Sequence, residues 1–197
     1  MGGTCLKRYN ILNLCSLIYN HYNNQNLKIN ILEVGVARGD TSKILVEEFK
    51  NATFYLFDTF EGLPSPTIED CKNQNIIGNY KFSLEDVKIF VGVKDNVHYI
   101  KGRIEDTLLK SLPNEKIHFI HLDVDLYQPT YYLLDNIIPK MAKPSIIIID
   151  DYGIGIHKIY DWQGIKKACD EIEQKYKVKF NLLNNKSLLT QAILFIF

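Results

Sequence analysis

The sequence lacks a surplus of either charge and any long apolar run. Lys and Arg together number 23, as do Asp and Glu, so the formal net charge is zero. Proteins that bind nucleic acids or membrane surfaces usually carry a basic excess, so we expect neither partner. The apolar stretches, such as that around 145–149, are far too short to cross a bilayer. Met1 to Leu6 contains no apolar signal region, and Leu6 argues against myristoylation of Gly2.

Cysteines are few and show no pattern. Cys5, Cys15, Cys71 and Cys169 form no CxxC pair, and no Cys/His cluster has the spacing of a zinc site. We therefore expect four reduced thiols in a cytoplasmic protein. The 197 residues, 46% of them hydrophobic, suit one α/β domain over residues 1–197.

Predicted strands and helices alternate along the chain. We expect a helical N-terminal segment (1–27, helix at 10–22) and further helices at 41–49, 130–141 and 162–176. Strands are expected at 28–34, 53–58, 97–101, 116–124, 145–150, 179–183 and 191–197. This order predicts a mostly parallel sheet covered by helices on both faces, with ligands bound beyond the carboxyl ends of the strands.

A long connection separates the second and third predicted strands. Residues 60–82 contain Pro64, Pro66 and Gly78. A connection of this length in a small domain is often a lid or a substrate loop, and an ordinary surface excursion explains it equally well.

The turn after the first predicted strand reads ExGxxxG, from Glu33 to Gly39. A dinucleotide-binding turn would read GxGxxG, because the backbone must approach a pyrophosphate. A small-residue turn that follows an acid suits a cofactor without a pyrophosphate, such as S-adenosylmethionine. Glu33 would favour its cationic end. Asp58, at the end of the second strand, is placed to accept the hydroxyls of a ribose.

Two pairs of acids end neighbouring predicted strands. Asp123 and Asp125 lie on one face if their strand stays regular, and Asp150 and Asp151 end the next strand. Four carboxylates at one end of a sheet repel one another unless a cation intervenes, and a hard ion such as Mg²⁺ prefers oxygen ligands. Asp123, Asp150 and Asp151 are the natural ligands, which leaves Asp125 as a base. Alternatively, these acids are solvated loop residues or helix caps.

Several stretches together resemble the macrocin O-methyltransferase family, which methylates sugar hydroxyls in antibiotic biosynthesis. The matching stretches run over 33–39, 57–64, 101–108, 122–127, Thr130, 149–153, Trp162 and Gly164. The stretch FDTFEGLP and the pair LDxDLY and DDYG are more specific than the glycine turn. The similarity covers about residues 30–175.

The resemblance implies a Rossmann-like class I methyltransferase fold, with a seven-stranded, mostly parallel sheet and helices on both faces. It implies S-adenosylmethionine and Mg²⁺ as cofactors, Asp123, Asp150 and Asp151 as metal ligands, and Asp125 as the catalytic base. The cofactor-binding residues that we predict are Glu33, Gly35, Val36, Ala37, Arg38, Gly39, Thr41, Asp58, Thr59, Phe60, Arg103, Ile104 and Asp123.

This chain departs from the family pattern at three places. Ala37 stands where Trp is frequent, Val124 stands where Gly is common, and the N-terminal part is shorter than in typical members. The stretch after Asp123 holds no lysine, the base of catechol-type relatives, so Asp125 is the better candidate. We expect Mg²⁺ to bind adjacent oxygens of a sugar or glycan-like acceptor.

Other polar and aromatic residues near this rim have two interpretations. Tyr127, Tyr152 and Trp162 would stack on a sugar or pack in the core, His121 is interpreted as structural, and His157 as a substrate contact. Two further functions stay open: a nicotinamide-dependent short-chain oxidoreductase, disfavoured by the missing GxGxxG, and a non-catalytic nucleoside-binding protein. Homo-oligomerisation also stays open.

Overall fold

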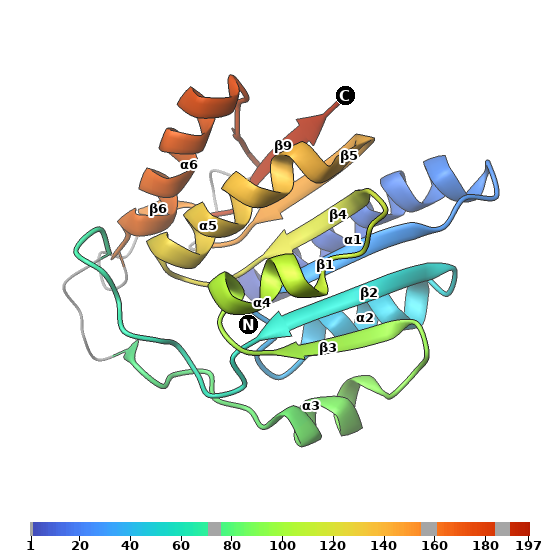
Figure 1. Ribbon diagram of the computed structural model, residues 1–197, viewed down its shortest axis with the longest axis horizontal. Helices are drawn as coiled ribbons and strands as arrows, with labels where there is room; N and C mark the ends of the chain where they lie inside the picture. The colour runs from blue at the N-terminus through green and yellow to red at the C-terminus, as the bar shows by residue number, and fades with distance from the viewer. Residues whose placement is uncertain (1, 71–75, 155–160, 184–189) are drawn as a thin grey trace.

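A seven-stranded sheet with strand order β3-β2-β1-β4-β5-β9-β8 forms the centre of the protein (Figure 1). The structure is a computed structural model that describes residues 2–70, 76–154, 161–183 and 190–197. The first five strands of this order, β3-β2-β1-β4-β5, pair in parallel, whereas β9 runs antiparallel to β5 and to β8. The strands are β1 (Ile29–Val34), β2 (Ala52–Asp58), β3 (Val97–Lys101), β4 (Ile117–Leu122), β5 (Met141–Ile149), β8 (Asn181–Leu182) and β9 (Ala192–Ile196).

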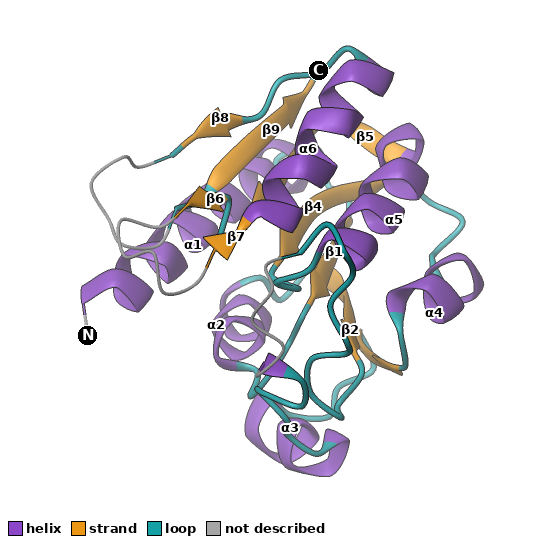
Figure 2. Cartoon of the chain, turned by 90° about the vertical axis from the view of Figure 1, so that its left-hand side faces the viewer, coloured by secondary structure: helices purple, strands orange, loops and turns teal. Residues whose placement is uncertain are grey.

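Helices cover both faces of this sheet, as the side view in Figure 2 shows. One face is covered by α1 (Gly2–Asn23), α2 (Asp40–Glu48) and α3 (Leu84–Val91). The other is covered by α4 (Ile104–Ser111), α5 (Tyr127–Ile137) and α6 (Gln163–Tyr176). The predicted α/β architecture with its seven-stranded, mostly parallel sheet is therefore confirmed. No helix in the described ranges is both long and apolar enough to span a membrane.

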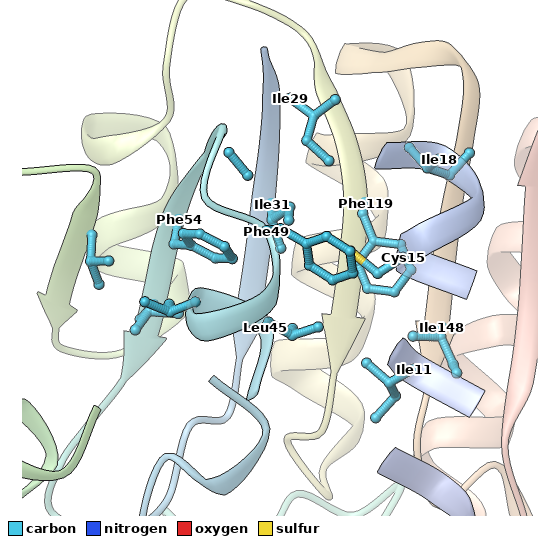
Figure 3. Packing of buried hydrophobic residues seen from close by; sticks show 14 of the residues in the cluster. Ile11, Cys15, Ile18, Ile29, Ile31, Leu45, Phe49, Phe54, Phe119 and Ile148 are labelled. Carbon is cyan, nitrogen blue, oxygen red and sulfur yellow. The ribbon is translucent and has the colours of Figure 1, made fainter. Parts of the chain in front are cut away.

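The two core layers are built from the alternating side chains of the central strands. Ile146 and Ile148 of β5 point into the layer below α1, and Ile147 and Ile149 point into the layer below α5 and α6. Figure 3 shows Ile11, Cys15 and Ile18 of α1 beside Phe119 of β4 and Ile148 of β5. The Cys15 thiol is free and buried, and burial raises its pKa. This packing fixes the position of α1, which matters for the site.

The strand order changes direction between β1 and β4. The chain moves from β1 to β2 and β3 on one side, and β4 and β5 lie on the other side. In open α/β sheets, the crevice at such a switch point receives the ligand. The residues that directly follow β1 and β4 therefore line the expected site.

Two short helices were not anticipated from the sequence. In α3, the Ser83 hydroxyl accepts the N–H of Asp86 and caps the helix, a Ser-x-x-Asp signal that marks a helix start. In α4, Ile104 and Leu108 recur at helical spacing and are buried. Both helices have eight residues, so their periodicity is brief.

Several predicted bounds were wrong by a few residues. Helix α5 begins at Tyr127 rather than 130, because Pro129 is tolerated in a first turn whose N–H groups have no helical partner. β5 begins at Met141, where a helix was still expected, after a 3₁₀ turn at Ile138–Lys140. Trp162 belongs to the hairpin of β6 (Gly153–Ile154) and β7 (Asp161–Trp162), so α6 begins one residue later.

Candidate active site

The turn between β1 and α2 lies directly against the end of β4. Gly35, Ala37 and Gly39 have positive φ angles of 88°, 47° and 90°. A Cβ atom on Gly35 would lie 1.8 Å from the carbonyl oxygen of Asp123, so no other residue fits without displacing one of the two segments. The Asp123 N–H donates to the Val34 carbonyl at 2.8 Å and ties the segments together.

Asp58 holds this turn through its carboxylate. Oδ2 accepts the backbone N–H groups of Val36 (2.8 Å) and Ala37 (2.9 Å), and Oδ1 accepts the N–H of Phe60 (2.7 Å). We predicted Asp58 as a ribose acceptor. That role stays a prediction; in the structure Asp58 organises the backbone of the turn, which the sequence does not reveal.

Glu33 lies beneath the turn and is 1% exposed. Its carboxylate accepts a short hydrogen bond from the Ser42 hydroxyl of α2, and Oε1 lies 3.1 Å from Nδ1 of His121. The other ring nitrogen of His121, Nε2, lies 3.7 Å from Oδ2 of Asp150, too far for a hydrogen bond. Burial alone would lower the pKa of His121, but Asp150 and Glu33 outweigh burial and raise it to about 10. The imidazolium therefore lies between Glu33 and the acidic residues, and the structural interpretation of His121 stays a prediction.

The acidic residues converge after β4 and β5. Oxygen atoms of Asp123, Asp125 and Asp151 lie within 4.8 Å of one another, and a second group joins His121, Asp123 and Asp150. β4 ends at Leu122, so Asp123 and Asp125 do not share the face of a regular strand. Asp125 and Asp151 instead have left-handed backbones (φ 61° and 54°), a conformation that Asp tolerates better than most residues. The backbone after each strand, not strand alternation, brings the carboxylates together.

The electrostatics of these carboxylates differ sharply. Burial and the charges of Asp150 and Asp151 raise the pKa of Asp123 to about 7. Burial and the same kind of repulsion raise the pKa of Asp125 well above its ordinary value. Burial would also raise the pKa of Asp150, but His121, Lys7 and Gln191 outweigh it and lower the value to about 2. Asp150 is thus an anion among donors, whereas Asp123 and Asp125 lie buried beside like charges.

Two cavities meet at the turn. One of about 360 Å³ is lined by nine of the predicted residues, namely Gly35, Ala37, Asp58, Thr59, Arg103, Ile104, Asp123, Asp125 and Asp151. A second of about 280 Å³ is lined by Glu33, Val36, Arg38 and Thr41 together with Gly35, Ala37 and Asp123. Gly39, Phe60 and Asp150 line neither cavity. Gly39 packs against Val91, and Phe60 is 3% exposed in the core. Asp150 accepts a hydrogen bond from the side chain of Gln191.

The segment 60–82 contributes a wall of the larger cavity through Gly62, Leu63, Pro64, Asn79 and Tyr80. Its base is closed by two hydrogen bonds, from the Leu63 N–H to the Asn79 carbonyl and from the Gly78 N–H to the Leu63 carbonyl, both 2.9 Å. Farther along, Oδ1 of Asp70 accepts the Tyr127 N–H at 2.7 Å, at the start of α5. The segment thus lines the cavity, and its role as a lid or substrate loop stays a prediction.

The sequence prediction missed the cavity residues Lys7 and Arg8 of α1. A signal was present, because Lys7 stands four residues before Ile11 and so continues the apolar stripe. Of the aromatics, Tyr152 is buried beside Phe180, and the Tyr127 hydroxyl donates to Glu171 at 2.7 Å. The Trp162 side chain and His157 lie outside the described residues.

The strand order, with an antiparallel strand beyond five parallel ones, is that of the class I methyltransferases. Two solved structures with this fold are similar. The O-methyltransferase NovP has a TM-score of 0.70 and 21% identity, over 94% of this chain and 78% of that one. The calicheamicin methyltransferase CalS11 has a TM-score of 0.65 and 21% identity, over 94% and 79%.

The chain belongs to the macrocin O-methyltransferase (TylF) family, whose sequence pattern matches residues 4–184. A 4′-O-methyltransferase of a rhamnosyl tetracenomycin from Streptomyces olivaceus is 27% identical over 73% of this chain. The demethyldecarbamoylnovobiocin O-methyltransferase of Streptomyces niveus is 22% identical over 80% of it. The chain spans 61% of the length of each relative. Membership of this family does not favour the oxidoreductase alternative.

Proposed function

We propose that this protein transfers the methyl group of S-adenosylmethionine to a hydroxyl of a sugar or glycan-like small molecule, with assistance from Mg²⁺. One observation carries the proposal: the Gly35 turn and the carboxylates of Asp123, Asp125 and Asp151 line the same cavity. Family membership supports the methyl-transfer chemistry. The relative from S. olivaceus, which its name describes as acting on a rhamnosyl compound, supports the sugar-type acceptor.

The carboxylates suit a hard divalent cation. Asp123 and Asp125 have raised pKa values because they are buried beside like charges, and a Mg²⁺ ion bound through carboxylate oxygens would relieve such repulsion. The residues that would hold the ion are Asp123 and Asp151, which lie in one group of close oxygens, and Asp150, which joins Asp123 in the other. When bound, Mg²⁺ supplies Lewis acidity that lowers the pKa of an acceptor hydroxyl.

The remaining chemistry falls to the side chains of the cavity. The acceptor oxygen forms a bond to the methyl carbon as the carbon–sulfur bond of the sulfonium breaks. Asp125, which lines the cavity, takes the proton that the hydroxyl loses. The Gly35 turn, held by Asp58, lines the same cavity and would position the methyl donor beside the acceptor.

A methyl-transfer screen tests this proposal. Purified protein is incubated with S-adenosylmethionine and nucleotide sugars, simple glycosides or catechols, with Mg²⁺ or with excess chelator, and products are analysed by mass spectrometry. We expect one added methyl group on a sugar hydroxyl, lost with the chelator. Transfer that persists in chelator contradicts the role of Mg²⁺, and transfer to catechols alone contradicts the acceptor class.

A further inference from the structure

Lys7 brings a positive charge into the acidic cluster from a distant part of the chain. It stands on the same stripe of α1 as Ile11, Cys15 and Ile18, which pack on the sheet (Figure 3). Because α1 begins at the carboxyl end of the strands, this stripe carries Lys7 to the rim. Its side chain is buried there, with 9% of the residue exposed.

The Lys7 ammonium bridges two of the proposed metal ligands. Nζ lies 2.9 Å from Oδ1 of Asp151 and 3.2 Å from Oδ2 of Asp150. These carboxylates therefore already surround one cation, which belongs to the chain itself.

The position of this ammonium is supported by a buried amide network. Asn10 Nδ2 donates to Gln191 Oε1 at 2.9 Å, and Gln191 Nε2 donates to Asp150 Oδ1 at 2.6 Å. Gln191 also contacts the carbonyl of Lys7 at 3.4 Å. The first turns of α1 are thus fastened to Asp150 and to the start of β9, so Lys7 is built into the cluster.

We propose that Lys7 is a tethered cation that competes with the divalent ion for Asp150 and Asp151. An ammonium and Mg²⁺ cannot share these oxygens, because two cations at such a separation repel strongly in a buried site. Metal binding therefore requires the ammonium to leave the pair and enter the cavity that Lys7 lines. Lys7 would keep the metal-free carboxylates together and lower the affinity for the ion. This inference rests on the proposed Mg²⁺ site.

Binding of Mn²⁺ to the intact protein, followed by electron paramagnetic resonance, tests the competition without any turnover. Lys7→Met keeps the apolar stem and removes the charge, so we expect Mn²⁺ to bind tighter by a factor on the order of ten or more. Lys7→Arg retains the charge and is expected to bind no tighter than wild type. Lys28→Met is the matched control, because Lys28 is exposed and precedes β1 at the opposite end of the sheet. Unchanged or weaker binding by Lys7→Met overturns the proposal.

A measurement on the wild-type protein covers the case in which Lys7→Met fails to fold. Reductive methylation of amines, read by peptide mass spectrometry, reports whether Lys7 is accessible. We expect Lys7 to be protected without metal and to react faster once Mg²⁺ is added, with Lys28 unchanged. Equal protection in both states overturns the proposal. A protein that binds Mn²⁺ but transfers no methyl group would contradict the proposed function and leave the competition intact.

Discussion

Asp58 in one half of the rim, and Asp123 and Asp125 in the other, have opposite surroundings. In the half formed by β1 and β2, the oxygens of Asp58 accept three backbone N–H groups. In the half formed by β4 and β5, Asp123 and Asp125 face other carboxylates, and burial with repulsion raises their pKa values. The residue type is the same in both halves, but the partners differ.

This difference separates a carboxylate that holds the backbone from carboxylates that repel one another. A buried acid that accepts several N–H groups stabilises the folded chain. A buried acid beside like charges destabilises it until a cation or a proton arrives. A structure can therefore rank acids by role before any ligand is seen, and the ranking can be tested.

The largest expected effect concerns the proposed base. Asp125→Asn should lower turnover by about 10²- to 10⁴-fold, because an amide cannot take the proton. Mn²⁺ affinity should be largely kept. Steady-state methyl transfer and metal binding are the two measurements, with Asp106→Asn on the exposed face of α4 as the control. Full turnover of Asp125→Asn would remove the base assignment.

The next effect concerns the close approach between the two halves. Gly35→Ala should lower the free energy of unfolding by about 2–4 kcal/mol, because the new methyl group meets the carbonyl of Asp123. Gly153→Ala is a matched control, since Gly153 has a similar φ of 91° and open space around its would-be Cβ. This variant should lose only about 1–2 kcal/mol of stability, because its backbone is strained but its new methyl group meets no other atoms. Equal losses in urea unfolding would show that the close approach is unimportant.

A pair of substitutions tests the comparison directly. Asp58→Asn should lower the free energy of unfolding by about 1–3 kcal/mol, because an amide donor would face a backbone N–H. Asp123→Asn removes a repelled charge, so the metal-free protein should unfold at the same urea concentration or a higher one, while activity is lost. Equal destabilisation of both variants would show that the folded chain depends on Asp58 and on Asp123 to the same degree.

The smallest effect is a dependence of stability on pH. The pKa of His121 is raised to about 10, so its ion pairs contribute fully below about pH 6.5 and are lost as the pH rises toward 10. Urea unfolding of the metal-free protein should show a loss of stability on the order of 2 kcal/mol between pH 7 and pH 9. His121→Gln should flatten this slope, and His98→Gln, at an exposed position, should not.

Features set by local patterns were predictable from the sequence. The central strands follow from apolar runs, and the Gly35 turn follows from its place between a strand and a helix. The convergence of Asp123, Asp125 and Asp151 was predicted because parallel strands end at one edge. The expected cause was wrong, since β4 ends before Asp123 and the backbone of Asp125 is left-handed.

Features that join distant segments were not predictable in the same way. The partners of Asp58 are N–H groups whose direction depends on the left-handed backbone of Ala37. No pattern in the sequence predicts that backbone conformation. Lys7 reaches Asp150 and Asp151 across more than 140 positions, and the helix that carries it was expected to begin at residue 10. The sequence places Lys7 on the apolar stripe of its helix, but only the assembled sheet shows which carboxylates it meets.

The segment 60–82 is fastened at its base, between Leu63 and Asn79, and again where Asp70 meets α5. Neither fastening touches the Gly35 turn or the acidic cluster. Substitutions at Gly62 to Pro64 or at Asn79 and Tyr80 would therefore change the shape of the larger cavity without altering the Gly35 turn or the acidic cluster. The acceptor that we propose could thus be changed through side chains of one segment, with the fold kept.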